Sequence, residues 1–236
     1  MKKLTNISKV LLLLILAVIF SLSMAGWAGA DIVTMGLNTT YSGTSPAGSA
    51  PWITATFTDA GTNNVQLTLS AGNLTGSEFI SGWYFNLNTS LDPSNLAFTA
   101  VNTSDVGTTS ITQGTDCCKP DGDGKFDFVF SFPTAGGSGR FNAGESVVYN
   151  ISSTGLSAAS FNTYNTPKDS NPFFTSAAHI QSINGIDGDG TSADPGSGWI
   201  ASTTATVVPE PVSSTLFIIG SALLGIKVYR NKRIKV

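Results

Sequence analysis

Positively charged side chains are almost missing from the middle of this chain, and charge of either sign is scarce throughout. Only 11% of the 236 residues are charged, whereas glycine, serine, threonine and asparagine are abundant. This composition favours a secreted β-protein over a cytosolic helical one. Between Asp31 and Val208 there are four basic residues against fourteen acidic ones, a net charge of −10. Such an acidic stretch repels nucleic acid, so we exclude nucleic acid as a partner.

Cysteine and histidine are nearly absent as well. The only cysteines, Cys117 and Cys118, are neighbours, which excludes an ordinary disulfide framework. We expect two loop residues near a turn, with a vicinal or an intermolecular disulfide as the alternative. His179 is the sole histidine, so it is the only histidine base that a serine hydrolase could use. A strand histidine that is satisfied by the backbone or partly exposed is the preferred interpretation, and we expect no enzymatic activity.

Long helical periodicity is lacking before the C-terminal tail, and short runs of alternating apolar residues take its place. In the clearest run, one strand face carries Phe126, Phe128, Phe130 and Phe132, which need a hydrophobic layer opposite. Further strands are expected around residues 52–58, 65–69, 83–87, 96–98, 147–151, 177–183 and 199–208. Seven to nine strands of this kind predict an all-β fold, an antiparallel β-sandwich of jelly-roll or Greek-key type.

The N-terminus has the order of a secretory signal. Three lysines precede an apolar run over residues 10–20, and small residues then lead to Ala28-Gly29-Ala30. The run is shorter than the roughly 20 residues that span a bilayer, which disfavours an uncleaved anchor. We predict a signal peptide over residues 1–30, with Ala28 and Ala30 at the cleavage site and export through the Sec translocon.

The C-terminus changes composition abruptly after Val208. Two prolines end the strand pattern, an almost wholly apolar segment runs from Thr215 to Ile226, and a basic cluster closes the chain. We predict a single transmembrane helix over about 212–229 and a cytoplasmic basic tail over 230–236. The extracellular β-sandwich domain is then expected over residues 31–206.

This tail resembles a known sorting signal. Val208, Pro209, Glu210 and Pro211, followed by the glycine-containing apolar segment and the Arg/Lys end, are similar to a PEP-CTERM signal, here over residues 207–236. Such signals occur on exported proteins of Gram-negative bacteria that make exopolysaccharide, and an exosortase, a membrane cysteine protease, recognises the tripeptide. The resemblance implies that these four residues are a processing motif. An ordinary anchor whose linker happens to read Pro-Glu-Pro is the alternative.

The resemblance also implies a route and a place for the protein. The precursor would cross the inner membrane, stay anchored through residues 212–229, and reach the cell surface or the extracellular space after processing. We expect a structural protein of the exopolysaccharide or biofilm matrix. The exosortase and the translocon would be its partners during export, with exopolysaccharide as a candidate partner afterwards. Tails of this kind also carry the name of an ice-binding protein C-terminal domain, which by itself implies nothing about ice.

Other functions rank below this one. A cell-surface carbohydrate-binding module is the first alternative, and its candidate stacking residues are Trp52, Trp83 and Trp199. A secreted hydrolase or an ice-binding protein ranks lower. Threonines on one face of residues 52–58 are of the type found in ice-binding arrays, but one strand does not make an array. These threonines are Thr54, Thr56 and Thr58.

One acidic loop is a candidate calcium site, although no cofactor is required by the sequence. Asp121 and Asp123 lie two apart among glycines, and Asp127 follows, so the backbone could wrap a hard cation. The loop departs from an EF-hand because Lys125 takes the fifth position and Phe132 takes the place of the final glutamate. A second loop carries Asp187, Asp189 and Asp194. Solvated Asp-Gly turns are the alternative for both loops.

Overall fold

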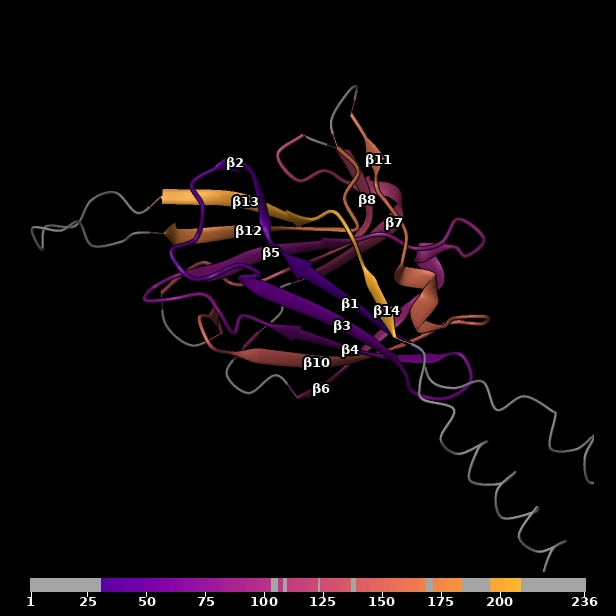
Figure 1. Cartoon of the computed structure of the whole chain (residues 1–236). Helices are drawn as coiled ribbons and strands as arrows, with labels where there is room; N and C mark the ends of the chain where they lie inside the picture. The colour runs from indigo at the N-terminus through magenta and orange to yellow at the C-terminus, as the bar shows by residue number, and fades with distance from the viewer. Residues whose placement is uncertain are drawn as a thin grey trace, which may run out of the picture. The chain divides into compact units, whose positions relative to one another are not determined.

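The alternating apolar runs become strands, and the strands form two layers. The computed structural model describes residues 31–102, 106–107, 110–122, 124–136, 139–168, 172–183 and 196–208. Within these ranges the chain forms fourteen strands and two short 3-10 helices, arranged as two stacked antiparallel sheets (Figure 1). The all-β class and the two-sheet architecture predicted from the sequence are therefore confirmed.

The first sheet has six strands and contains both ends of the described chain. Its order is β14-β1-β3-β4-β10-β6, and every neighbouring pair is antiparallel. Each of its long strands buries every second side chain, as the period of two requires. The strands are β14 (Thr206–Val208), β1 (Ile32–Leu37), β3 (Ile53–Asp59), β4 (Asn64–Ser70), β10 (Ser146–Ser152) and β6 (Ala97–Asn102).

The second sheet has eight strands and carries the candidate site. Its main order is β11-β8-β5-β12-β13-β2, with β7 paired to β8 and β9 paired to β5. Its strands are β11 (Thr166–Pro167), β8 (Gly124–Ser131), β5 (Phe79–Phe85), β12 (Ser176–Ile183), β13 (Gly196–Ser202), β2 (Thr39–Gly43), β7 (Ser110–Cys118) and β9 (Phe141–Asn142). The 3-10 helices η1 (Pro93–Asn95) and η2 (Ala158–Phe161) lie in the connections.

The main core lies between the sheets and is rich in aromatic side chains. Phe57 of the first sheet meets Phe85 of the second edge to face at 5.4 Å, and Tyr149 lies 4.8 Å from Phe130. All four side chains are buried. Truncating a buried phenylalanine to alanine in such a layer typically costs about 3–5 kcal/mol of stability.

A second, smaller cluster lies apart from the main core. It contains Phe126, Val129 and Phe174, with Tyr84 packed against it. The expectation that Phe126, Phe128, Phe130 and Phe132 share one layer is therefore wrong for Phe126, because only the other three belong to the core between the sheets.

Two further expectations need correction. The described residues contain fourteen strands, whereas seven to nine were expected, because β1, β2, β7, β9 and β11 went unrecognised and the run expected over 199–208 forms two strands, β13 and β14. Cys117 and Cys118 close strand β7, so they are not loop residues. Strand β7 was not predicted because most of its residues are polar, namely threonine, glutamine, serine and aspartate, and its few apolar residues do not alternate with them.

The last described strand ends at the first residue of the predicted sorting motif. Strand β14 pairs with β1 and reaches Val208, so the expected domain boundary at residue 206 falls inside this strand. Val208, the first residue of the predicted motif, is exposed at the sheet edge. The predicted signal peptide with Ala28 and Ala30, the rest of the predicted motif (Pro209, Glu210, Pro211) and the helix expected over 212–229 lie outside the described residues. Within the described ranges, no helix is long and apolar enough to cross a membrane.

Candidate functional site

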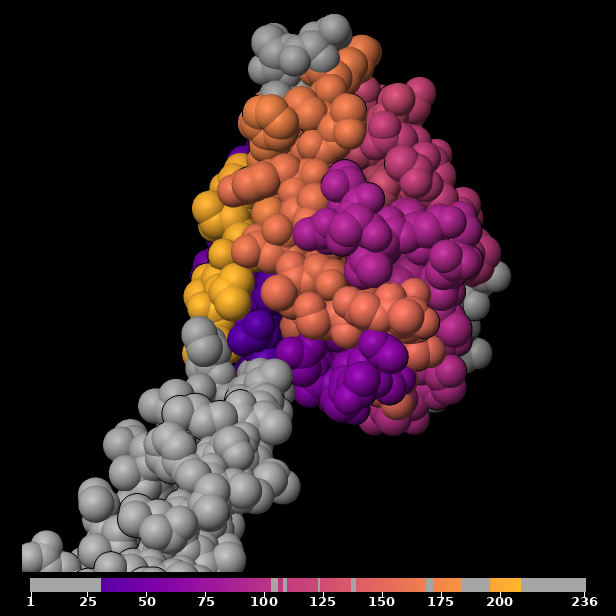
Figure 2. Space-filling view, turned by 90° about the vertical axis from the view of Figure 1, so that its right-hand side faces the viewer, coloured from indigo at the N-terminus to yellow at the C-terminus, as the bar shows by residue number. Residues whose placement is uncertain are grey.

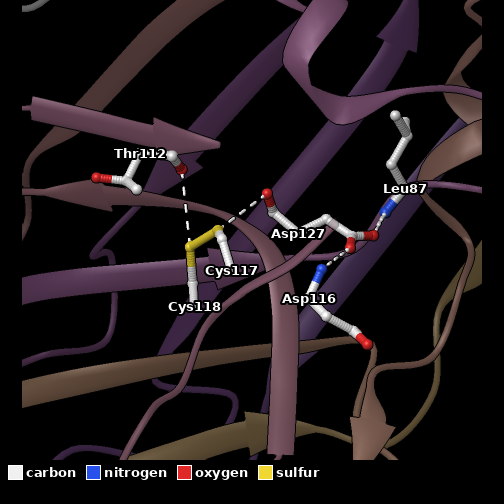
Figure 3. Close-up of a disulfide and its surroundings, with 6 residues drawn as sticks. All are labelled: Leu87, Thr112, Asp116, Cys117, Cys118 and Asp127. Carbon is white, nitrogen blue, oxygen red and sulfur yellow. Dashed lines mark hydrogen bonds between the residues drawn. A yellow bond between two sulfur atoms is a disulfide. The ribbon is translucent and has the colours of Figure 1, made fainter. Parts of the chain in front are cut away.

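Asp127 of β8 joins two distant loops through its carboxylate. Its Oδ2 accepts the backbone N–H of Leu87 at 2.9 Å, and its Oδ1 accepts the backbone N–H of Asp116 at 2.9 Å (Figure 3). Charged acceptors make the stronger class of hydrogen bond. The carboxylate therefore ties the segment after β5 to the end of β7 and shapes the surface between them.

Next to this junction, Cys117 and Cys118 are joined by a vicinal disulfide. The Sγ of Cys117 lies 3.3 Å from the carbonyl oxygen of Asp127 (Figure 3). An oxidised sulfur carries no hydrogen, so this is a sulfur–oxygen contact and not a hydrogen bond. Of the two alternatives to free loop thiols, the structure contains the vicinal disulfide.

A pocket of about 180 Å³ opens beside Asp127, and we call it the Asp116 pocket. Asp116 has a left-handed φ of 55°, which is uncommon outside glycine and which directs its carboxylate at the pocket rim. That carboxylate also faces the ammonium of Lys125 at 3.7 Å. The lining residues are polar with three exceptions, Leu87, Leu91 and Pro93: the others are Asn86, Thr89, Thr115, Asp116, Asp127, Thr163, Tyr164 and Thr166.

Tyr164 lines the Asp116 pocket, and a second exposed aromatic ring, that of Phe173, packs against Tyr164 without lining the pocket itself. Tyr164 and Phe173 are 51% and 57% exposed, and their ring centroids are 6.1 Å apart in an edge-to-face arrangement. Asn165 holds the two segments together, since its N–H donates to the Phe174 carbonyl at 2.8 Å and its Oδ1 accepts the Phe174 N–H at 2.7 Å. We call Tyr164 and Phe173 the aromatic pair.

Two wider hollows adjoin the Asp116 pocket at the same end of the sandwich. One, of about 840 Å³, shares Leu91 with it and is lined mainly by asparagine, serine and threonine. The other, of about 470 Å³, shares Thr166 and is lined by three lysines, Lys119, Lys125 and Lys168. Figure 2 shows this end, where the orange segments around η2 and β11 border the magenta segment around η1. The three hollows thus follow one another across a single face.

The structure gives a different result for each of the three residues predicted to bind calcium. Asp127 already accepts two backbone N–H groups, Asp121 is exposed with a φ of 47°, and Asp123 lies outside the described residues. Across the described part of the chain, no three His, Cys, Asp or Glu side chains gather in a way that could hold a metal. Calcium binding stays a prediction. Calcium binding by the second acidic loop also stays a prediction, because that loop lies outside the described ranges.

His179 is held on β12 within the second sheet. Its Nδ1 lies 2.8 Å from the Ser81 hydroxyl, and the Trp199 ring stacks on the imidazole at 4.3 Å. The register of β12 against β5 shifts here, so Ser81 and Gly82 form a bulge that turns the serine toward the histidine. A serine nucleophile also needs a carboxylate hydrogen-bonded to the histidine ring. No described carboxylate makes that bond, so the geometry is that of a satisfied strand histidine.

The environment of His179 disfavours its charge. Burial against the sheet lowers the pKa of the imidazole below its usual value, and the negative charge of Asp121 acts in the opposite direction as the smaller cause. The imidazole is therefore neutral at neutral pH.

The three tryptophans predicted as stacking residues for a carbohydrate do not form a common exposed surface. Trp83 is fully buried and Trp52 is 8% exposed, so neither can stack on a ligand. Only Trp199 is partly exposed, on the outer face of the second sheet. The aromatic pair was missed because Tyr164 and Phe173 sit in polar loops without a period, and only the fold brings them together.

The threonines of β3 do have neighbours on adjacent strands. Thr56 lies opposite Thr34 of β1 and Thr68 of β4, and Thr34 lies opposite Thr206 of β14. One row of threonines therefore crosses four strands on the outer face of the first sheet. The expectation that the array is confined to one strand is wrong, because register aligns residues that are far apart in the chain.

Comparison with known proteins adds no assignment. No protein-family model matches the chain, and no curated protein matches its sequence. That the tail is a sorting signal stays a prediction, which rests on the sequence of the tail alone.

Proposed function

We propose that this chain is an exported surface protein whose β-sandwich is delivered to the exopolysaccharide matrix after an exosortase processes the tail at Pro209-Glu210-Pro211. The observation that carries the proposal is the position of the domain ends. The first strand begins at Ile32, just after the proposed signal cleavage at Ala30, and the last strand ends at Val208. The folded domain thus fills the interval between the two proposed processing sites.

The domain itself suits an extracellular structural role. It has an aromatic core, very little charge and an oxidised vicinal disulfide, which is consistent with a compartment outside the cytoplasm. The chain alternates between the two sheets, as from β1 to β2 and back to β3, which favours a jelly-roll or Greek-key order. The signal peptide and the transmembrane helix over 212–229 are parts of the same proposal.

The decisive experiment separates processing from anchoring. In a host with an exosortase, the parent protein should lose residues 1–30 and its tail, as measured by intact mass. Glu210→Ala leaves the apolar segment unchanged, so this variant should be exported but accumulate as the longer, membrane-held form. A matched change in the same tail, Ser213→Ala, should be processed like the parent. Normal processing of the Glu210 variant would leave a simple C-terminal anchor as the explanation.

Ice binding is a second candidate, favoured by the threonine row alone. Threonines in register across neighbouring strands repeat at about 4.7–4.9 Å, and their outward positions repeat every two residues along each strand. The row comprises Thr206, Thr34, Thr56 and Thr68. Thermal hysteresis that is present in the parent and lost in Thr56→Lys, but kept in Thr99→Lys on β6, would support this function.

A further inference from the structure

We propose that the Asp116 pocket binds one sugar ring of a polysaccharide, with Tyr164 stacked against the face of that ring and Phe173 supporting Tyr164 from the side. This inference goes beyond the proposed function, because it assigns a ligand class and a site. It does not depend on how the chain is exported or processed.

The aromatic pair is unusual for a surface of this kind. Most of the large apolar side chains of the described residues are buried, and those exposed number five: Val101, Tyr164, Phe173, Val207 and Val208. Only Tyr164 and Phe173 are aromatic, and they lie together. The faces of aromatic rings carry partial negative charge, which attracts the C–H groups on the flat side of a sugar ring.

The pair is also held in place before any ligand arrives. Asn165 is 3% exposed, and its two hydrogen bonds to Phe174 join the residue that follows Tyr164 to the residue that follows Phe173. Gly124 leaves room for this side chain, because a Cβ at that position would overlap Asn165 Nδ2. A preorganised site loses less conformational entropy on binding, so more of the contact energy remains as affinity.

The size and the polar groups of the pocket fit a single ring with hydroxyls. At about 180 Å³, it is smaller than the roughly 300–1,000 Å³ of sites for drug-sized ligands. The Asp116 carboxylate is 35% exposed and can accept a hydroxyl proton in a charge-assisted hydrogen bond. Asp127 keeps lone pairs after accepting two N–H groups. Threonine hydroxyls supply both donors and acceptors.

Other ligand classes fit less well. An anion inside the pocket would face the carboxylates of Asp116 and Asp127, and an apolar ligand would leave them desolvated without partners. A neutral ring with several hydroxyls avoids both costs. Further units of the same polymer can follow past Leu91 into the hollow of about 840 Å³, which is lined mainly by uncharged asparagine, serine and threonine side chains, with Asp92 as its one carboxylate. Past Thr166, the lysine-lined hollow would accept an acidic substituent.

The test uses the full chain in mild detergent and affinity electrophoresis in gels that contain one polysaccharide each. Dextran, galactomannan and a mixed-linkage β-glucan serve as neutral probes, and alginate serves as the acidic probe. We expect retardation by at least one neutral probe, with no loss in 0.5 M NaCl. Tyr164→Ala and Phe173→Ala should each weaken binding about tenfold, as expected for aromatic anchors.

The control is Val101→Ala on β6, which removes an equally exposed apolar side chain from the other sheet and should bind like the parent. The melting temperature of each variant reports whether its fold is intact. Absence of retardation by every neutral probe would overturn the proposal. So would binding to alginate alone, or a loss of binding in Trp199→Ala with none in Tyr164→Ala. None of these outcomes bears on tail processing, which the Glu210 experiment tests separately.

Discussion

Ile32 lies directly opposite Val208 in the antiparallel pair of β1 and β14, so the two ends of the domain leave the sheet side by side. Strand β14 is an edge strand, bonded to the sheet on one side only. The predicted motif therefore follows the sheet edge without a spacer. An enzyme that binds Glu210 must approach the edge of the folded sandwich closely.

The three cross-strand pairs of β14 should contribute measurably to stability. Each such pair is worth roughly 0.2–1 kcal/mol. We expect a domain that ends at residue 205 to unfold with about 1–2 kcal/mol less free energy than one that ends at residue 208, as measured by urea denaturation. Equal stability of the two would show that β14 adds nothing to the sheet, whereas failure of the shorter domain to fold would show that it adds far more.

Replacing Asp127 should destabilise the domain more than replacing Asp121. Asp127→Ala removes two hydrogen bonds to a charged acceptor and leaves the N–H groups of Leu87 and Asp116 without it, at a cost of about 3 kcal/mol or more. Asp121→Ala changes an exposed side chain and should stay within about 0.5 kcal/mol. Denaturant titration measures both. Similar losses in the two variants would contradict this account of the carboxylate.

Melting temperatures measured with and without calcium distinguish the structural role of Asp127 from a role as a metal ligand. If the loop binds calcium, millimolar calcium should raise the melting temperature by mass action, and Asp123→Ala should abolish the rise. Asp127→Asn should lower the melting temperature by a similar amount with and without calcium. A parent protein that shows no rise would leave plain Asp-Gly turns.

The disulfide should leave no reactive thiol in the exported protein. We expect iodoacetamide to add no mass under denaturing, non-reducing conditions, and to add two carbamidomethyl groups after reduction. The protein should run as a monomer on a non-reducing gel. Two modified thiols without reductant would restore the interpretation as free cysteines, and a reducible dimer would indicate an intermolecular bond.

Regular alternation of apolar and polar residues made several strands predictable, although β1 was missed despite burying Val33, Met35 and Leu37. In β3, β4 and β10 apolar residues alternate with polar ones, and all three were expected close to their observed bounds. Strand β2 lies at the sheet edge and buries none of its residues, so its sequence carries no such alternation.

The candidate site was harder to predict because long-range contacts build it. Asp127 was noticed as a carboxylate near glycines, but its partner Leu87 lies forty residues earlier in the chain. Tyr164 and Phe173 are paired only through Asn165 and Phe174. Nothing in the local pattern distinguishes these residues from those of any polar loop.

Gly124 gives a direct test of how the aromatic pair is positioned. It adopts a φ of 147°, in the region that favours glycine, and a Cβ would overlap the Asn165 side chain. We expect Gly124→Ala to cost about 1–3 kcal/mol, as overpacking typically does. Gly122→Ala in the same turn also has a positive φ but meets nothing nearby, so it should cost less. Equal costs would show that backbone strain, and not the contact with Asn165, dominates.

The single histidine makes the pH dependence of stability simple to interpret. Burial lowers the pKa of His179 in the folded state, so the unfolded chain takes up a proton at a higher pH than the folded one. Stability should therefore fall as the pH drops through about 6.5, the usual pKa of histidine, and this decline should stop below the folded-state pKa. Histidine is the side-chain type whose ordinary pKa lies between pH 5 and 8, and His179 is the single histidine, so between pH 7.5 and 5.5 the imidazole dominates the change among the side chains. The melting temperature of the parent should fall across this interval, whereas that of His179→Gln should stay nearly constant, because glutamine can still bond Ser81 but does not titrate. If the two curves run parallel, another group must titrate, and the assignment of the half-buried neutral imidazole on β12 fails.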